Sequence, residues 1–409
     1  ARLTARGAVA GLEARADPLG ARRRFAAPPL PTRRVNIADR LDNWARAPPV
    51  LGHVHSRPSS EPYEFSEVRE FGEGLQMPDG WATKLVSATG LKSVETPNQD
   101  SFSYTLLDSG WIVCVVCDGH GEFGNIISER VARLVPLHFS ESHEKLGAEE
   151  ALTQSFLATQ SDLEESLAKA QKLSGTTAAA LCFHIESGRA LVAFAGDTRV
   201  VLGDMSSGEV VYCTHEHKPH DEGEADRLRE CGAQVISRAY EDGELVSRVF
   251  VPGTGVPGLA MSRSLGDGCL KGFGVTAAPD VLDVSAAWAG CTAPVAVLAS
   301  DGLLDFVSAD DTVSMLASRC RRRLDVGRGV EVLLRRSQKL WIQSEGDYCD
   351  DITVLLLAPS KSLQPADAGE VDETDASGDK AQPTRNLPGA TAGAAPSFDA
   401  ADASMHSSA

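Results

Sequence analysis

Short apolar runs, each bounded by Gly, Asp or Pro, dominate the middle of this 409-residue sequence. They are rich in β-branched residues and too short for helices, which is typical of β-strands. Many are joined by tight turns, as at residues 186–189 and 204–208, which favours antiparallel pairing over βαβ units. The runs are Ser103–Leu107, Trp111–Cys117, Thr176–Phe183, Ala190–Phe194, Arg199–Leu202, Val295–Ala299 and Ile352–Leu357.

Segments with helical spacing of apolar residues interrupt these strands. The predicted helices are 123–135, which we expect Pro136 to end, 152–167, 221–231 and 330–342. Sheets that bury a face, with amphipathic helices between hairpins, must pack in layers. The pattern therefore predicts an α+β fold in which two stacked antiparallel β-sheets form a central sandwich, flanked by antiparallel helices in a four-layer αββα arrangement.

The two ends differ in composition from this body. Residues 1–75 are rich in Arg and Pro, and residues 360–409 in Ala, Gly, Asp and Ser. We expect a largely disordered N-terminal extension and a disordered acidic tail around one domain, 80–359. The Arg-rich start also resembles an organelle transit peptide, so the expectation of a cytoplasmic or nuclear protein leaves organelle targeting open.

The formal net charge of −18 restricts the partners of this chain. Nucleic acids and acidic membrane surfaces would both repel it. A membrane-spanning helix needs a run of about 18 apolar residues, and the sequence contains no such run. We expect no nucleic-acid partner, no membrane association and a monomer.

The cysteines do not indicate a metal or redox site. The chain has nine, and the C-x-x-C pair Cys114 and Cys117 stands inside an apolar run. A zinc site would need a turn between the two thiols and a second pair. We interpret both as small core side chains in a reduced compartment.

The most informative polar feature is Asp118-Gly119-His120, which follows the run Trp111–Cys117. A carboxylate at the end of a buried strand needs a positive partner. Gly119 allows the backbone to approach that partner, and His120 stands within reach of it. The alternative is an ordinary Asx-type turn followed by an unrelated histidine.

Acidic residues recur at four further strand edges. They are Asp100, Asp197, Asp301 and the pair Asp350-Asp351. If these carboxylates converge, cations must offset their repulsion. Coordination by oxygen alone favours Mg²⁺ or Mn²⁺ over zinc.

Nine short motifs follow one another between residues 83 and 358. They are Asn98-Gln-Asp100, Asp118-Gly-His-Gly121, Ser174-Gly-Thr-Thr177, Gly196-Asp-Thr-Arg199, His217-Lys-Pro219, Leu259–Asp267, Pro279-Asp-Val281, Asp301-Gly-Leu-Leu-Asp305 and Asp350-Asp-Ile-Thr353. In this order they resemble the metal-dependent type-2C (PPM-type) protein serine/threonine phosphatases. The resemblance implies two face-to-face antiparallel sheets with helices outside and two metal ions at one end.

The resemblance also assigns the metal ligands. Asp118 would bridge both ions and Gly119 would bind one through its carbonyl, while Asp301 and Asp350 would hold the first ion. Gln99 stands where the family usually has glutamate at the second ion.

Three further acids fall on family positions. Asp100 would support the second ion through water. Asp197 matches an acid that helps form a weaker third site, and Asp351 replaces the family's usual asparagine.

The implied activity is hydrolysis of phosphoserine and phosphothreonine in phosphorylated proteins by a metal-activated water. His120 would give a proton to the leaving oxygen. Two alternatives come from other classes. One is a catalytically weak member acting as a phosphoprotein-binding or regulatory module, which Gln99 keeps open. The other is a cation-buffering protein, which would not need His120.

Substrate contacts are less well defined. The family carries a basic residue that grips phosphate before the acid at position 100, and Glu95 has the wrong sign. Lys92 is the candidate, and its alternative is a solvated surface lysine. Residues 213–257 correspond to a flap that influences substrate choice, and we expect this insert to be mobile. For Arg199 and Arg263 we expect pairing with acids.

Overall fold

The computed structural model describes residues 50–53, 69–71, 78–92, 96–239, 245–321 and 327–363. Two six-stranded sheets form its centre, and all their strand pairs are antiparallel. The first sheet has the order β1 (Val50–His53), β4 (Ser101–Leu106), β5 (Trp111–Cys117), β8 (Ala178–His184), β9 (Ala190–Ala195) and β15 (Asp280–Asp283). The second has the order β11 (Glu209–Cys213), β10 (Arg199–Asp204), β16 (Pro294–Ala299), β17 (Ile352–Pro359), β3 (Trp81–Ala88) and β2 (Arg69–Phe71).

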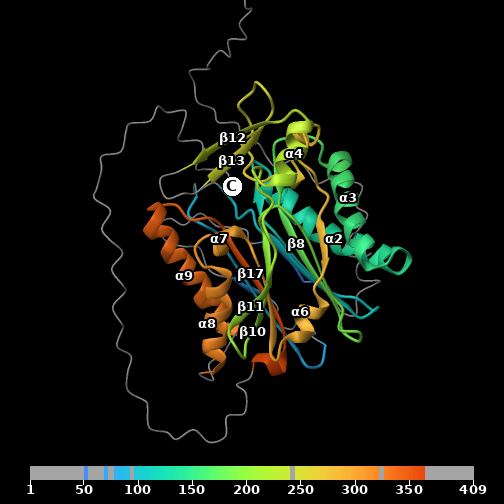
Figure 1. Ribbon diagram of the computed structural model, residues 1–409, viewed down its shortest axis with the longest axis vertical. Coiled ribbons are helices and arrows are strands. Elements are labelled where there is room, and N and C mark those ends of the chain that lie inside the picture. Colours follow the sequence, from blue (N-terminus) through green and yellow to red (C-terminus); the bar gives the residue numbers. More distant parts are fainter. Residues whose placement is uncertain are drawn as a thin grey trace, which may run out of the picture.

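The sheets stack face to face with helices outside, as Figure 1 shows. Helices α2 (Gly124–Leu146) and α3 (Ala148–Ser166) lie against the first sheet. Helices α7 (Asp301–Leu304), α8 (Ala309–Arg321) and α9 (Gly327–Glu345) lie against the second. The predicted αββα sandwich is therefore confirmed.

Strand β5 shows why the central strands are apolar throughout. Val113 and Val115 pack towards α2 and α3, whereas Ile112, Cys114 and Val116 face the second sheet. Successive side chains on a strand point to opposite faces, so a strand covered on both sides loses the polar alternation of a half-exposed one. The burial of Cys114 agrees with its interpretation as a core side chain.

Helix α2 runs through Pro136, so the prediction that Pro136 ends this helix is wrong. A proline inside a helix removes a hydrogen bond and costs roughly 3 kcal/mol. Leu137 and Phe139 follow it and are fully buried. Each such burial contributes roughly 1.5–3 kcal/mol, which offsets the cost.

Short elements complete the described structure. Strands β14 (Leu265–Gly266), β7 (Gly175–Thr176) and β6 (Gly119–His120) form a three-stranded sheet, with α5 (Gly268–Lys271) following β14. The remaining short elements are η1 (Ala170–Lys172), α6 (Ser285–Gly290) and η2 (Ser360–Leu363).

The insert 213–257 contains helix α4 (Glu222–Glu230) and the hairpin of β12 (Gln234–Ala239) and β13 (Leu245–Phe250). Leu228 of α4 and Val249 of β13 share a small apolar cluster with Leu259 and Leu270. Residues 240–244 lie outside the described part of the chain.

Strands β1 and β2 fall within 1–75, the segment predicted to be largely disordered, and both stand at sheet edges. The rest of that segment, and the tail after residue 363, lie outside the described residues. Among the described helices, none combines the length and the apolar character that a membrane span requires.

Candidate functional site

One end of the sandwich gathers buried aspartates from both sheets. They are Asp100 before β4, Asp118 after β5, Asp197 between β9 and β10, Asp301 after β16 and Asp350 before β17. These are the strand-edge acids that the sequence analysis selected.

Antiparallel pairing brings these acids to the same end. Ser101 pairs with Cys117, so the residues next to them, 100 and 118, are neighbours. In the second sheet Ala299 pairs with both Arg199 and Val354, which places the start of β10 and of β17 beside the end of β16. The Ser300 hydroxyl then joins the two sheets by donating a hydrogen bond to Asp100 Oδ2 at 2.8 Å.

The acids perturb one another strongly. Burial raises the pKa of Asp118, and the charges of Asp301, Asp100 and Asp350 raise it further. Burial, Asp350 and Asp197 raise the pKa of Asp301 to about 7. Asp301 Oδ1 and Asp197 Oδ1 are buried and have no hydrogen-bond partner among the described residues. Such oxygens fit divalent-cation ligands, because an ion would supply both the missing partner and the missing positive charge.

Lysines already neutralise part of this charge. Lys92 Nζ lies 2.5 Å from Asp350 Oδ1 and 3.0 Å from Asp351 Oδ2. Although burial opposes it, the charges of Asp350 and Asp351 raise the pKa of Lys92 well above its ordinary value. Its side chain is 16% exposed, so the alternative of a solvated surface lysine is wrong. Lys218 Nζ donates to Asp197 Oδ2 at 2.8 Å.

Asp351 organises the segment that carries Gln99. Its carboxylate accepts hydrogen bonds from the Gly90 and Gln99 backbone N–H groups, both at 2.8 Å, and from Lys92. Gln99 Nε2 donates to the Gly121 carbonyl at 2.6 Å, so only the amide oxygen of Gln99 could bind a metal. The asparagine that the family usually carries at position 351 would lack the charge that pairs with Lys92.

Gly119 is required by its surroundings. A Cβ at this position would lie 2.5 Å from the carbonyl oxygens of both Gln99 and Gly124. The Gly119 N–H also donates to Gln99 O at 3.1 Å. Only glycine therefore fits between these two carbonyl groups.

His120 forms an ion pair that the sequence analysis did not predict. Its Nε2 lies 2.8 Å from Asp267 Oδ2, and both side chains are buried. Strand β7 pairs with β6 and with β14, which brings His120 and Asp267 together. Burial opposes the charge, but Asp267 raises the pKa of His120, and His120 lowers that of Asp267.

Asp267 is held in an unusual backbone conformation. Its φ is +49°, in the left-handed region that non-glycine residues rarely adopt. Its N–H donates to Ser174 O at 3.0 Å, and the Ser264 hydroxyl donates to Asp267 Oδ2 at 2.6 Å. A Cβ on Gly175 would lie 2.1 Å from Asp267 Oδ2, so only glycine leaves room for this carboxylate.

A second cluster lies beside this end of the sandwich. His215 Nε2 and His217 Nε2 lie 3.2 and 3.3 Å from Asp280 Oδ2. Among the described residues these three could hold a metal ion, since their ligand atoms all lie within 4.8 Å of one another. The predicted metal ligands are not part of this group.

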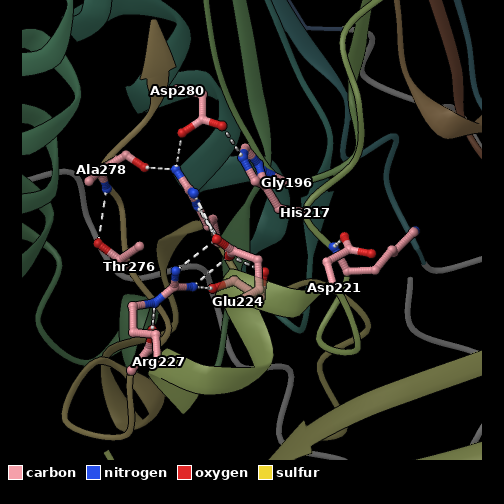
Figure 2. Close-up of polar contacts among 12 residues, drawn as sticks. Gly196, His217, Asp221, Glu224, Arg227, Thr276, Ala278 and Asp280 are labelled. Carbon is pink, nitrogen blue, oxygen red and sulfur yellow. Dashed lines mark hydrogen bonds and ion pairs between the residues drawn. The ribbon is translucent and has the colours of Figure 1, made fainter. Parts of the chain in front are cut away.

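Hydrogen bonding argues against an ion at this second cluster. The Gly196 N–H donates to His217 Nδ1 at 3.2 Å, so His217 Nε2 carries the ring hydrogen and donates it in a hydrogen bond to Asp280 Oδ2 at 3.3 Å (Figure 2). Arg263 Nη1 also donates a hydrogen bond to Asp280 Oδ1 at 2.6 Å. We therefore interpret the cluster as a hydrogen-bonded network.

That network continues into the flap-like insert. Arg263 also binds Glu224 of α4 through Nη2 at 2.7 Å, and Arg227 binds the same carboxylate at 2.6 and 2.8 Å (Figure 2). The expected pairing of Arg263 with acids is confirmed. Arg199 pairs with Glu216 at 3.4 Å, as also expected.

A cavity of about 560 Å³ lies beside this hydrogen-bonded network. Its lining includes Arg199, Glu216, Lys218 and Asp221. Lys218 connects it to Asp197, so the cavity adjoins the carboxylate site.

Comparisons with known proteins agree on one family. A family model described as protein phosphatase 2C matches residues 92–333. "Probable protein phosphatase 2C 12" of Oryza sativa subsp. japonica is 30% identical over 360 residues, which cover 75% of this chain and 89% of that protein. "Probable protein phosphatase 2C 65" of Arabidopsis thaliana is 30% identical over 319 residues, covering 71% and 81%.

A solved structure shares the fold. The serine-threonine phosphatase 2C of Toxoplasma gondii superposes with a TM-score of 0.54 at 22% identity, covering 76% of this chain and 99% of that one.

Proposed function

Because the chain belongs to the protein phosphatase 2C family of serine/threonine phosphatases, we propose that it hydrolyses phosphoserine and phosphothreonine in proteins with a water activated by Mg²⁺ or Mn²⁺. One observation carries the proposal. Buried aspartates from both sheets converge, and Asp301 and Asp197 each leave a carboxylate oxygen without a hydrogen-bond partner among the described residues.

The carboxylates would hold the ions. Asp118, Asp301 and Asp350 would bind the first ion, Asp118 would be shared with the second, and the Gly119 carbonyl would bind one of the two. Bound ions supply a hydroxide near neutral pH and neutralise charge on the phosphoryl oxygens.

The second and third ions have weaker ligand sets. Since its amide nitrogen donates to Gly121, Gln99 would offer the second ion only its neutral amide oxygen, and Asp100 would assist through water. Asp197 would contribute to a third site, where Lys218 now occupies one of its oxygens. Binding of a third ion therefore has to compete with this lysine.

His120 would act as the general acid. Asp267 engages Nε2, and Nδ1 has no protein partner among the described residues. The leaving serine or threonine oxygen would therefore take its proton from Nδ1. Asp267 raises the pKa of His120, which favours the protonated ring. Such acid catalysis contributes roughly 10²–10⁴-fold.

Lys92 would bind the substrate phosphate. Its ammonium is held charged between Asp350 and Asp351, at the edge of the carboxylate group. Binding of a cation at Asp350 would weaken that pair, and the ammonium could then turn to the phosphoryl oxygens.

The test is phosphate release from a phosphothreonine peptide with Mn²⁺, with EDTA, and in Asp301→Asn. We expect EDTA and the substitution each to abolish most of the rate. Asp226→Asn is the matched control, because Asp226 is exposed on α4 and, among the described residues, pairs with Arg229 alone. Equal rates under all conditions would contradict metal-dependent hydrolysis.

A specific observation supports a second candidate function, a phosphoprotein-binding module with weak catalysis. Gln99 brings no charge to the second ion, and its amide nitrogen is committed to Gly121. A slow Mn²⁺-dependent rate, together with retained binding of the phosphopeptide, would favour this function.

A further inference from the structure

Lys271 lies next to the His120–Asp267 pair without touching either residue. It is the last residue of α5 and is partly buried. Its Nζ donates to the Ser264 carbonyl at 2.7 Å and to the Ser264 hydroxyl oxygen at 3.4 Å. Desolvation lowers the pKa of Lys271 to about 8, against the opposing charges of Asp267 and Glu164.

The Ser264 hydroxyl connects this lysine to the ion pair. The hydroxyl donates to Asp267 Oδ2 at 2.6 Å, and Asp267 Oδ2 also lies 2.8 Å from His120 Nε2. A lysine ammonium can only donate, so an oxygen that lies against it must turn its own hydrogen elsewhere. The only other partner of this hydroxyl in the described structure is Asp267.

We infer that Lys271 is a positioning residue for proton transfer: it orients the Ser264 hydroxyl towards Asp267 and thereby keeps the Asp267 carboxylate against His120. The inference rests on the proposed function of His120 as the general acid. It assigns Lys271 no contact with the substrate or with a metal ion.

The competing explanation is purely structural, since Lys271 also ends α5 and fixes the Ser264 backbone. The two explanations differ in how the loss depends on the leaving group. A proton donor matters for an alkoxide, which leaves poorly, and little for p-nitrophenolate, which leaves unprotonated. Structural damage would lower both rates together.

The experiment measures kcat of the full chain with Mn²⁺ on a phosphoserine peptide and on p-nitrophenyl phosphate. We expect Lys271→Met to lower kcat on the peptide about tenfold, the scale of one charge-assisted hydrogen bond, and to leave the aryl phosphate within about twofold. Lys172→Met is the control, because Lys172 is exposed on the neighbouring η1 turn, and neither rate should change. Equal losses on both substrates, or no loss on the peptide, would overturn the inference.

Two further variants keep the test decisive. Ser264→Ala should give the same selective loss, and the double variant should lose no more than either single one, since both act through one contact. If Lys271→Met does not fold, Ser264→Ala alone decides: a selective loss supports the inference, and an unselective or absent loss overturns it.

Failure of the proposed function would look different. If His120→Ala lowers both rates equally, or neither, His120 is not the general acid and the proposed mechanism fails. If His120→Ala is selective and both Lys271→Met and Ser264→Ala are not, only the positioning role fails.

Discussion

Replacing Gly175 by alanine should separate the two halves of the His120–Asp267 pair. The added Cβ would lie 2.1 Å from Asp267 Oδ2, and 2.7 Å from the Leu265 carbonyl. An ordinary carbon–oxygen contact is above about 3 Å, so Oδ2 must retreat by about 1 Å. If Oδ2 moves away from His120, its 2.8 Å distance to His120 Nε2 grows to at most about 3.8 Å, beyond hydrogen-bonding range.

The cost follows from the kind of bond that is lost. A hydrogen bond to a charged group is worth about 1.5–3 kcal/mol. If His120 donates its proton in the transition state, this corresponds to roughly a 10- to 150-fold loss of kcat. We expect that loss on a phosphoserine peptide with Mn²⁺ present, and a much smaller one on p-nitrophenyl phosphate.

Gly272→Ala provides the matched control, because Gly272 has a φ of −69° and a Cβ there would meet nothing within 4 Å. Its rates should equal those of the wild type. Thermal unfolding of both variants separates loss of fold from loss of the pair. A Gly175→Ala protein that is folded and keeps its full rate on the phosphoserine peptide would refute the steric argument.

Three further outcomes follow from the charged groups. Asp301, whose pKa lies at about 7, should release its proton when Mn²⁺ binds. The Mn²⁺-binding enthalpy measured by calorimetry near pH 6 should therefore depend on the ionisation enthalpy of the buffer. A binding enthalpy that is the same in all buffers would contradict this. Glu224→Gln should lower the free energy of unfolding by about 2 kcal/mol near neutral pH, because it removes the ion-pair partner of the partly buried Arg227 and leaves Arg263 with Asp280 alone. Despite burial, hydrogen bonds from Arg227 and Arg263 lower the pKa of Glu224, so its contribution is complete above the ordinary value of 4.5 and is lost as pH falls through the depressed value. Urea titrations at several pH values should show that the difference in free energy of unfolding between the wild type and Glu224→Gln decreases in acid. A difference that stays constant with pH would count against the ion pairs of Glu224. Lys92→Met should raise KM for the phosphopeptide about tenfold with a smaller effect on kcat, which steady-state kinetics can check, and an unchanged KM would remove its phosphate role.

Local pattern was sufficient for the central strands. The run Trp111–Cys117 forms β5 with the predicted bounds, because apolar, β-branched residues between Gly and Asp leave few alternatives. Strand β3 (Trp81–Ala88) was missed, since its first half is only partly buried and carries Lys84. Helix α8 (Ala309–Arg321) was also missed.

The residues of the candidate site also differ in whether the local sequence predicts them. Asp118 directly follows β5, and Asp301 follows β16 after the single residue Ser300, so each has a local signal. The partner of His120 has none, since Asp267 lies 147 residues away and reaches His120 only through the pairing of β14, β7 and β6. The motif Leu259–Asp267 was the available hint. This motif ends at Asp267 without indicating what this acid contacts.

The network of Arg263, Glu224 and Arg227 has a consequence for how this enzyme could acquire new substrates. It fastens α4 to the catalytic end, whereas the hairpin of β12 and β13 exposes residues such as Ile236 and Leu245, at 43% and 42%. Random mutation therefore meets two different constraints within one insert. Changes on α4 would disturb the ion pairs of Glu224 with Arg227 and Arg263. Changes at the exposed positions of the hairpin would cost little in folding, unlike changes at Val249, which packs in an apolar cluster. If the insert influences substrate choice, as the resemblance to the family implies, recognition can diverge at these exposed positions while the acids at the end of the sandwich stay constant.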